Sequence, residues 1–343
     1  MTDPRSTRFK LLASLVTLLV FLIVTEGIVR LAGADTYVQN RFFTLNRALD
    51  YPDVFKKDRV LFWRLRSDRN VTSEFFEGRT YHINSLGLRG DEISSTKNKP
   101  RVVALGNSCT FGWGIPGGQT YSDRLQDILG NGYEVINAGI PGYTSYQGRE
   151  FFQKDILKLK PDILLVLFAW NDHWVAASAI ADKNQKFPPQ VIISLQNILE
   201  RFDSYRLLKK LLLSAVEKDP DSLFNRAAPV YRVGLEDFQD NLTAICDTAK
   251  AHGIKPVLMT SPIPPLSEMP SALAGMHRYH ERYNDAIRAV ASAEGVGLVD
   301  LAREFDTRKD LWDSTSHDWI HFNARGHLLA AQLIAQYMDS TSN

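Results

Sequence analysis

The sequence predicts an α/β protein with a mainly parallel sheet, preceded by an apolar N-terminal segment. Of its 343 residues, 44% are hydrophobic and 23% are charged, which is typical of a globular chain and excludes disordered and collagen-like classes. From about residue 100 onward, short apolar runs alternate with helical patterns, as in βαβ units whose sheet is covered on both faces. An uncharged run near the N-terminus is the third observation, and it indicates a transmembrane or signal segment.

The region 101–343 carries the alternation and is expected to form one α/β domain. Its expected strands are short apolar runs, at Val102–Leu105, Val135–Asn137, Ile163–Phe168, Pro256–Thr260 and Gly297–Asp300. Helical periodicity between and after these runs predicts helices near 119–129, 145–158, 234–252, 277–294 and 324–338.

Residues 175–232 interrupt this alternation and are expected to form an inserted helical cap. They contain a Pro-Pro pair and two helical stretches, one of which covers Ser204–Val216. The apolar spacing of that helix suits either packing within the cap or lying on a membrane surface, and we expect the packed arrangement.

The first 34 residues read as an N-terminal signal anchor, with a cleaved signal peptide as the alternative. Three basic residues precede the fifteen uncharged residues Leu11–Thr25, and apolar character continues beyond Glu26 to Arg30. Residues 11–29 would span about 28 Å as a helix, close to the ~30 Å of a bilayer's hydrocarbon. Cleavage near Ala34 would instead release a secreted protein. Either way, the basic end stays in the cytoplasm, and the bulk of the chain is expected on the extracytoplasmic, periplasmic side.

Residues 35–100 are expected to form a linker and accessory strands. The stretch Thr72–Leu88 resembles a hairpin turned at Gly78. No residue pattern in this region predicts chemistry.

Charge and cysteine content exclude several classes of function. Forty basic residues against 39 acidic ones give a net charge of +1, which offers no electrostatic basis for nucleic-acid binding. Two cysteines exclude a disulfide scaffold and a multi-cysteine zinc site. His277 and His280 are read as surface histidines of a helix, so no metal is expected. The segment Gly112–Gly117 matches G-x-G-x-x-G, but it starts six residues after its strand and Pro116 removes an N–H, so nucleotide binding is rejected.

Polar residues follow the expected strands at the points where parallel sheets place their chemistry. Ser108 follows the first strand in a glycine-flanked turn, where a nucleophile can be exposed beside helix N-terminal amides. Gly142 follows the second strand and could lend its backbone N–H. Asn171 follows the third, and its neutral amide can polarise an oxygen without titrating. Asp318 precedes His321 by three residues, a spacing that lets a carboxylate hold the imidazole while the other ring nitrogen acts as a base.

In this order, the motifs resemble the four blocks of the SGNH (GDSL-type) serine hydrolases. The blocks are G-N-S-C-T-F-G with Ser108, N-A-G-I-P-G-Y-T-S with Gly142, A-W-N-D with Asn171, and D-W-I-H with Asp318 and His321. The resemblance implies a flavodoxin-like three-layer α/β/α sandwich. It also implies an oxyanion hole made by the N–H groups of Ser108 and Gly142 and the side chain of Asn171.

The resemblance covers about residues 100–338, and the chain departs from the family pattern in three places. Asn107 replaces the first-block Asp, Ala169 replaces the Gly before Asn-Asp, and Phe322 replaces the usual Pro after the His. Asn107 is expected to weaken the local network, and none of the three removes a reacting group. The anchor with an accessory N-terminal segment also resembles, more loosely, bacterial SGNH proteins of envelope or exopolysaccharide function.

The expected function is an extracytoplasmic serine esterase that acts through a Ser108–His321–Asp318 triad and an acyl-enzyme. It needs no metal or organic cofactor. The expected substrate is an acyl ester, including an O-acetyl ester, of an envelope or exported glycan. Aromatic residues near the motifs are the candidates for substrate binding: Trp113, Tyr143, Trp170, Trp174 and Trp319. A lipid or thioester substrate also remains open. An O-acyltransferase using the same acyl-enzyme and a catalytically degenerate glycan-binding or assembly protein remain as alternatives.

Three aspartates precede His321, and the sequence allows any of them as its partner. They are Asp310, Asp313 and Asp318. Asp318 is expected, because a separation of three residues lets both side chains project from one turn at the entry to the last helix.

Overall fold

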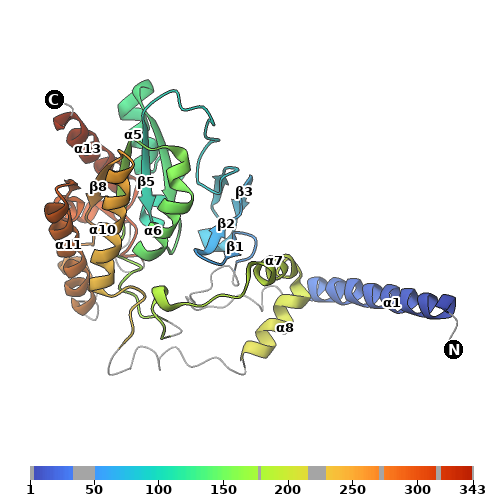
Figure 1. Cartoon of the computed structure of the whole chain (residues 1–343). Helices are drawn as coiled ribbons and strands as arrows, with labels where there is room; N and C mark the ends of the chain where they lie inside the picture. Colours follow the sequence, from blue (N-terminus) through green and yellow to red (C-terminus); the bar gives the residue numbers. More distant parts are fainter. Residues whose placement is uncertain are drawn as a thin grey trace.

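A computed structural model describes residues 4–33, 51–176, 179–214, 229–269, 274–313 and 318–341. Its centre is a sheet of five parallel strands in the order β6-β5-β7-β8-β9 (Figure 1). The strands are β5 (Arg101–Gly106), β6 (Glu134–Gly139), β7 (Ile163–Leu167), β8 (Lys255–Met259) and β9 (Gly297–Val299). All five coincide with apolar runs in the sequence, so the predicted parallel α/β fold is confirmed.

Helices cover both faces of this sheet because alternate strand residues point to opposite sides. On β5, Val103 and Leu105 belong to one buried cluster, which also contains residues of α6, α10 and α11. Val102 and Ala104 belong to a second cluster, with residues of α5, α12 and α13. The helices are α4 (Ser108–Phe111), α5 (Tyr121–Leu129), α6 (Ser145–Lys154), α10 (Leu235–Ala251), α11 (Ala274–Glu294), α12 (Leu301–Phe305) and α13 (Ala324–Ser340).

Short 3-10 helices occur in the connections between these elements. They are η1 (Glu74–Phe76), η2 (Gly130–Gly132), η3 (Ile156–Leu159), η4 (Asp182–Asn184), η5 (Leu266–Glu268) and η7 (Lys309–Leu311). The helix expected over 145–158 is therefore divided, because α6 ends at Lys154 and η3 follows it.

Two small antiparallel sheets precede the main domain and share its core. They are formed by β1 (Phe55–Asp58) with β2 (Phe62–Leu65) and by β3 (Arg69–Thr72) with β4 (Thr80–Ile83). The hairpin expected within Thr72–Leu88 lies earlier in the chain, because its first strand ends at Thr72 and the following Phe-Phe pair lies in η1 instead of a strand. Residues of both sheets are buried in the cluster that contains α6, so this region is part of the packed body.

The described part of the 175–232 insertion contains α7 (Gln190–Leu199) and α8 (Asp203–Ser214). Helix α7 packs against β1, and α8 packs against α1. The expected helix Ser204–Val216 corresponds to α8, and its residues beyond Ser214 lie outside the described residues.

The N-terminal helix α1 (Pro4–Leu31) projects from the body as a single rod (Figure 1). The helix from Arg8 to Leu31 is apolar and long enough to cross a membrane, and its large apolar side chains are exposed. The structure thus places the predicted N-terminal segment outside the protein core.

Candidate active site

The loop after β5 presents Ser108 at the first position of the short helix α4. Asn107 caps this helix, because its side-chain oxygen accepts a hydrogen bond from the Cys109 N–H at 2.9 Å. Gly106 is required here, since a Cβ would collide with the Leu167 carbonyl of the neighbouring strand β7. The tight passage from strand to helix therefore places the Ser108 side chain at the carboxyl edge of the sheet.

Ser108, His321 and Asp318 form one hydrogen-bonded chain. The His321 Nε2 lies 2.8 Å from Ser108 Oγ, and His321 Nδ1 lies 2.8 Å from Asp318 Oδ2. The other carboxylate oxygen of Asp318 accepts hydrogen bonds from the backbone N–H groups of Ile320 and His321, each at 3.0 Å. This is the geometry in which a carboxylate orients an imidazole and the imidazole can remove the serine proton.

The Asp318 carboxylate keeps its charge in this setting. Burial alone would raise its pKa, but the hydrogen bonds and charge of His321 and the backbone N–H groups outweigh burial, and the pKa is lowered from its ordinary value. A charged carboxylate is the form that can hold the ring and stabilise an imidazolium.

The two competing aspartates are engaged elsewhere. Asp313 accepts a hydrogen bond from the Asn323 side chain at 3.0 Å. Asp310 lies 3.6 Å from Arg308, and its backbone carbonyl also accepts from Asn323. Among the three aspartates, only Asp318 is hydrogen-bonded to His321 within the described residues.

Three candidate oxyanion donors converge because they follow three adjacent strands. Ser108 follows β5, Gly142 follows β6, and Asn171 follows β7, with β6 and β7 on either side of β5. The Ser108 N–H opens α4, where first-turn amides have no intrahelical acceptor. The Asn171 side chain donates one N–H to the Tyr143 carbonyl at 3.0 Å, which leaves its second N–H for another acceptor.

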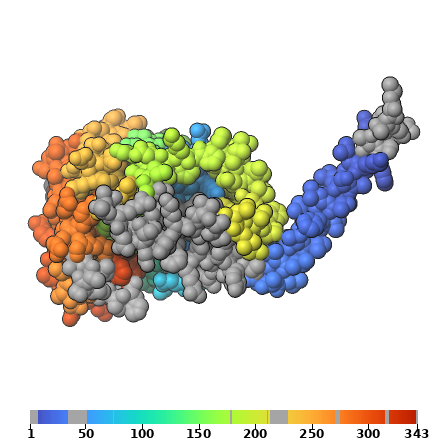
Figure 2. All heavy atoms as spheres, turned by 90° about the horizontal axis from the view of Figure 1, so that it is seen from below, coloured from blue at the N-terminus to red at the C-terminus, as the bar shows by residue number. Residues whose placement is uncertain are grey.

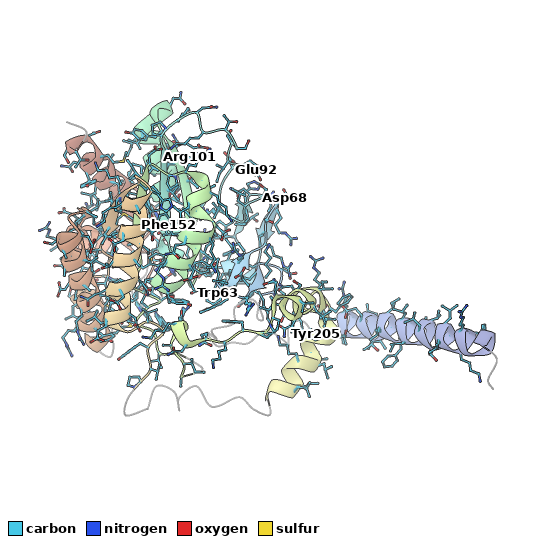
Figure 3. All side chains as sticks on the ribbon, viewed as in Figure 1. Trp63, Asp68, Glu92, Arg101, Phe152 and Tyr205 are labelled. Carbon is cyan, nitrogen blue, oxygen red and sulfur yellow. The ribbon has the colours of Figure 1, made fainter. Side chains whose placement is uncertain are left out.

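The turn that carries Gly142 is held at three successive carbonyl groups. The Trp63 indole Nε1–H donates to the Pro141 carbonyl at 3.1 Å, and Arg232 donates to the Gly142 carbonyl at 2.8 Å. The third carbonyl, that of Tyr143, accepts from Asn171. The Tyr143 hydroxyl in turn donates to the Trp63 carbonyl at 2.7 Å. In Figure 3, Arg101 marks the start of β5, and Trp63 lies toward the opposite end of the sheet.

A buried ion pair anchors this turn to the insertion. The Arg232 guanidinium contacts the Asp182 carboxylate at 2.9 Å and the Gln147 side chain at 2.9 Å, and Asp182 also accepts from the Thr144 hydroxyl. Both charged side chains are almost completely buried. Removing one partner would leave an uncompensated buried charge, which makes this pair a rigid support of the turn.

Two residues of this support were missed by the sequence analysis. Trp63 lies in the region where no chemistry was expected, and Arg232 lies at the end of the insertion. Each contacts a residue about 80 or more positions away in the sequence, so no local spacing could have indicated its role.

Asp172, next to Asn171, connects the end of β7 to the start of α6. It is fully buried and accepts a hydrogen bond from the Ser145 N–H at 2.7 Å. Burial raises its pKa to about 7, despite hydrogen bonds from Ser145 and the charge of Arg232, which act in the opposite direction. The residue thus belongs to the support of the site and does not touch the triad.

The five candidate substrate-binding aromatics are placed differently by the structure. Trp113 is half-buried and stacks on the His321 ring, with centroids 5.6 Å apart. Trp174 and Trp319 are also half-buried. Tyr143 and Trp170 are core residues, fully buried, and Trp170 donates to the Pro262 carbonyl. The expectation that these two rings bind substrate is therefore wrong, because neither is accessible.

The three departures from the family pattern leave the reacting groups in place. Asn107 still caps α4 through its side-chain oxygen, but its buried Nδ2 has no hydrogen-bond partner among the described residues, as expected of a weakened local network. Ala169 has a φ of 140°, a conformation that glycine adopts freely and alanine rarely does, so this position is strained. Phe322 is buried against Phe305 and His327.

The reading of His280 as a surface histidine is wrong. His280 is fully buried, contacts His173 at 2.9 Å and the Ser261 carbonyl at 2.9 Å, and packs on Trp170. Burial lowers the pKa of His173 to about 4 and that of His280 well below its usual value, which favours the neutral form of both rings. His277 is half-buried. Within the described ranges, no group of three or more His, Cys, Asp or Glu side chains is arranged to hold a metal ion.

Comparison with known proteins gives matches over the same region. A model of the GDSL-like lipase/acylhydrolase family matches residues 104–329. The chain is 26% identical over 224 residues to the uncharacterized lipoprotein YqeF of Bacillus subtilis (strain 168), covering 60% of this chain and 71% of that protein. It is 38% identical over 104 residues to an acetylxylan esterase of Xylanibacter ruminicola, covering 27% of this chain and only 22% of that enzyme. The lipase/acylhydrolase of Enterococcus faecalis is a similar solved structure, with 17% identity, a TM-score of 0.46, and coverage of 70% of this chain and 96% of that one.

Proposed function

The chain belongs to the GDSL-like lipase/acylhydrolase family and is a carboxylic ester hydrolase, and from that premise we propose that Ser108, His321 and Asp318 are its catalytic triad. The observation that carries this proposal is the unbroken chain of two 2.8 Å contacts from Ser108 Oγ through His321 to Asp318. Both contacts are within the range of strong hydrogen bonds.

In the proposed reaction, His321 Nε2 takes the Ser108 proton as Ser108 Oγ bonds to the ester carbonyl carbon. The tetrahedral intermediate collapses, the alkoxy group leaves with the proton from His321, and an acyl-enzyme remains. Water then attacks the acyl-enzyme with His321 again acting as base, and the acid is released. Asp318 keeps the imidazole in the required tautomer throughout.

The oxyanion is proposed to be stabilised by the N–H groups of Ser108 and Gly142 and by Asn171 Nδ2. Such donors are effective when their direction is fixed before the reaction. The C=O and N–H of a trans peptide point in opposite directions. The bond from Trp63 to the Pro141 carbonyl therefore fixes the direction of the Gly142 N–H, which makes Trp63 a positioning residue.

Trp63→Phe is expected to lower kcat roughly 10- to 100-fold while leaving KM for a short ester nearly unchanged, because the donor remains but loses its fixed direction. Steady-state kinetics on the full-length protein measures both constants. Trp312→Phe is the matched control, since the Trp312 indole is also buried but its N–H has no hydrogen-bond partner among the described residues. Equal kcat losses in the two variants would show that the effect is only general loosening of the core.

We propose that the substrate is an O-acetyl or other short acyl ester of an envelope or exported glycan. Two observations support this class. Trp113 stacks on the His321 imidazole, and Trp319 lies between Asp318 and His321 in the sequence. Aromatic rings of this kind suit the faces of sugars. One relative is named as an acetylxylan esterase.

The substrate proposal predicts faster acetate release from O-acetylated xylooligosaccharides than octanoate release from an octanoyl ester, by at least roughly tenfold in kcat/KM. With a sugar acceptor added to the reaction, chromatography of the products shows whether the acyl-enzyme is hydrolysed by water or transfers its acyl group to the sugar. Free acetate indicates hydrolysis, whereas acetylated acceptor would indicate the O-acyltransferase alternative. A preference for the octanoyl ester would contradict the proposed substrate class.

We propose that α1 anchors the protein in a membrane with the catalytic domain on the extracytoplasmic side. Support comes from its exposed apolar surface, from the basic residues that precede it, and from the relative that is named a lipoprotein. The protein is expected to stay in the membrane fraction after carbonate extraction and to be digested by protease added from outside. A mature N-terminus at Asp35 would instead indicate a cleaved, secreted enzyme.

A further inference from the structure

Helix α7 contacts the protein through Gln196, Asn197 and the buried Ile193, whereas most of its other apolar side chains face outward. Asn197 accepts from the Lys57 N–H at 2.7 Å and donates to the Lys57 carbonyl at 2.9 Å, so it pairs with the edge of β1. Gln196 and Glu200 contact the Lys57 ammonium group. No residue of α7 is charged. Surface helices of globular proteins usually turn their apolar side chains toward the core and their polar side chains toward solvent.

Helix α8, which begins soon after α7 ends, also exposes apolar side chains. The exposed residues on and after α7 follow spacings of three and four, and Val191 is 72% exposed. On α8 the exposed leucines Leu211 and Leu212 lie three and four residues after Leu208, which places all three on one side of the helix. We call this surface the α7–α8 apolar face, formed by Val191, Ile192, Leu195, Ile198, Phe202, Leu208, Leu211 and Leu212. A cluster of exposed apolar side chains marks an interaction site more often than single exposed residues do.

The α7–α8 apolar face lies at the end of the body from which α1 emerges. The Glu26 carboxylate of α1 accepts hydrogen bonds from the Asp203 and Ser204 N–H groups, each at 3.0 Å, and from the Ser204 hydroxyl at 2.7 Å. Arg30 lies 3.7 Å from Asp203 and bonds to the Arg201 carbonyl. The last turns of α1 are thereby fixed to the start of α8. Figure 2 shows α8, in yellow, directly beside the base of the blue α1.

We propose that the α7–α8 apolar face rests in the interface of the lipid bilayer that α1 spans. This inference depends on the membrane anchorage proposed above. Continuity with α1 selects a bilayer as the occupant, because a surface fixed to the last turns of a spanning helix lies at the depth of the headgroups. The uncharged α7 suits burial at the boundary between headgroups and acyl chains. The contact would hold the catalytic domain in one orientation above the membrane.

The test places a spin label on the full-length protein in nanodiscs that contain one copy each. Leu195→Cys probes the α7–α8 apolar face, Leu18→Cys probes the spanning part of α1, and Ile128→Cys is the matched control on α5, where Ile128 is 47% exposed. The two native cysteines are buried, and burial raises the pKa of the Cys246 thiol to about 12 and that of Cys109 well above its usual value. They should therefore react poorly with the label.

Collision with lipid-soluble oxygen and with a water-soluble nickel chelate reports the surroundings of each label. We expect the labels at positions 195 and 18 to collide severalfold more with oxygen than with nickel, and the label at position 128 to show the reverse. Turnover of a short soluble ester confirms that each labelled protein is folded.

Three results would overturn the inference, and each points to a different explanation. If the label at position 195 resembles that at 128 while the label at 18 is in lipid, the anchor holds and the apolar face does not touch the bilayer. If the label at 18 is also in water, the proposed anchorage fails with it. If the label at position 195 is shielded from nickel only in vesicles that hold several copies of the protein, the inference is also overturned. The α7–α8 apolar face would then be assigned to contact between copies of the chain.

Discussion

Ser108→Ala is expected to slow release of acetate from an O-acetyl ester by roughly 10⁵–10⁶-fold, because the acyl group then has no side chain to bond to. The residual rate would come from substrate binding and from the remaining oxyanion donors. Turnover of the purified full-length protein measures the loss. Reaction with a fluorescent fluorophosphonate, which bonds covalently to an activated serine, provides a readout independent of the substrate. Wild-type protein is expected to be labelled and Ser108→Ala to remain unlabelled.

Cys109 provides the control, because it is the next residue and carries a potential nucleophile. Its side chain is buried, its Sγ lies 3.6 Å from the Ile320 carbonyl, and burial raises its thiol pKa well above the usual value. A protonated buried thiol is inert. Cys109→Ala is therefore expected to keep labelling and most of the turnover. Labelling that survives Ser108→Ala would assign the nucleophile elsewhere, and absence of labelling in the wild type would favour a degenerate binding protein.

The carboxyl edge of the sheet could be predicted because its signals are local. The runs in β5 and β7 are buried on both faces, and such strands are continuous apolar segments. Once the strands are parallel, their ends share one edge, and residues just beyond them must meet there. Ser108 and Asn171 are two and four residues beyond their strands, so the sequence was sufficient to bring them together.

The support of the site could not be predicted because it depends on pairing between distant segments. Trp63 contacts Pro141 only after the β1–β2 hairpin has packed against the loop that follows β6. Nothing in the local sequence of either partner indicates the other. The accessory region therefore contributes to the geometry of the site through packing, although it carries none of the reacting groups.

The burial of His280 could have been predicted from the sequence, in contrast to the contacts of Trp63. Its neighbours on α11, Tyr283, Asn284 and Ile287, are buried and lie three, four and seven residues further along. This spacing places His280 on the inward stripe of the helix. The surface interpretation rested on the lack of an acidic or cysteine partner beside His277 and His280, whereas the periodicity of the helix indicated the core.

Asp318→Asn is expected to lower turnover by about four orders of magnitude while leaving substrate binding mostly intact, as in the best-studied serine triad, where the amide holds the imidazole in the wrong tautomer. The reason lies in the 2.8 Å contact between Asp318 Oδ2 and His321 Nδ1, which an amide N–H in place of the oxygen would oppose. Because its pKa is lowered, Asp318 stays ionised as the pH falls to its ordinary pKa and somewhat below. Loss of activity in mildly acidic buffer is therefore not expected to come from protonation of this carboxylate.

Asp313→Asn and Asp310→Asn are the matched controls, since each makes the same chemical change within eight residues of Asp318. Both side chains are exposed, and the Asp313 contact is an acceptor bond from Asn323 that an asparagine oxygen can also make. Their kcat values are therefore expected to stay within about threefold of wild type, because surface substitutions of this kind change little. The comparison separates a partner of the imidazole from a nearby negative charge. If Asp313→Asn were the damaging change and Asp318→Asn mild, the hydrogen-bonded chain from Ser108 to Asp318 would not be the one that performs the reaction.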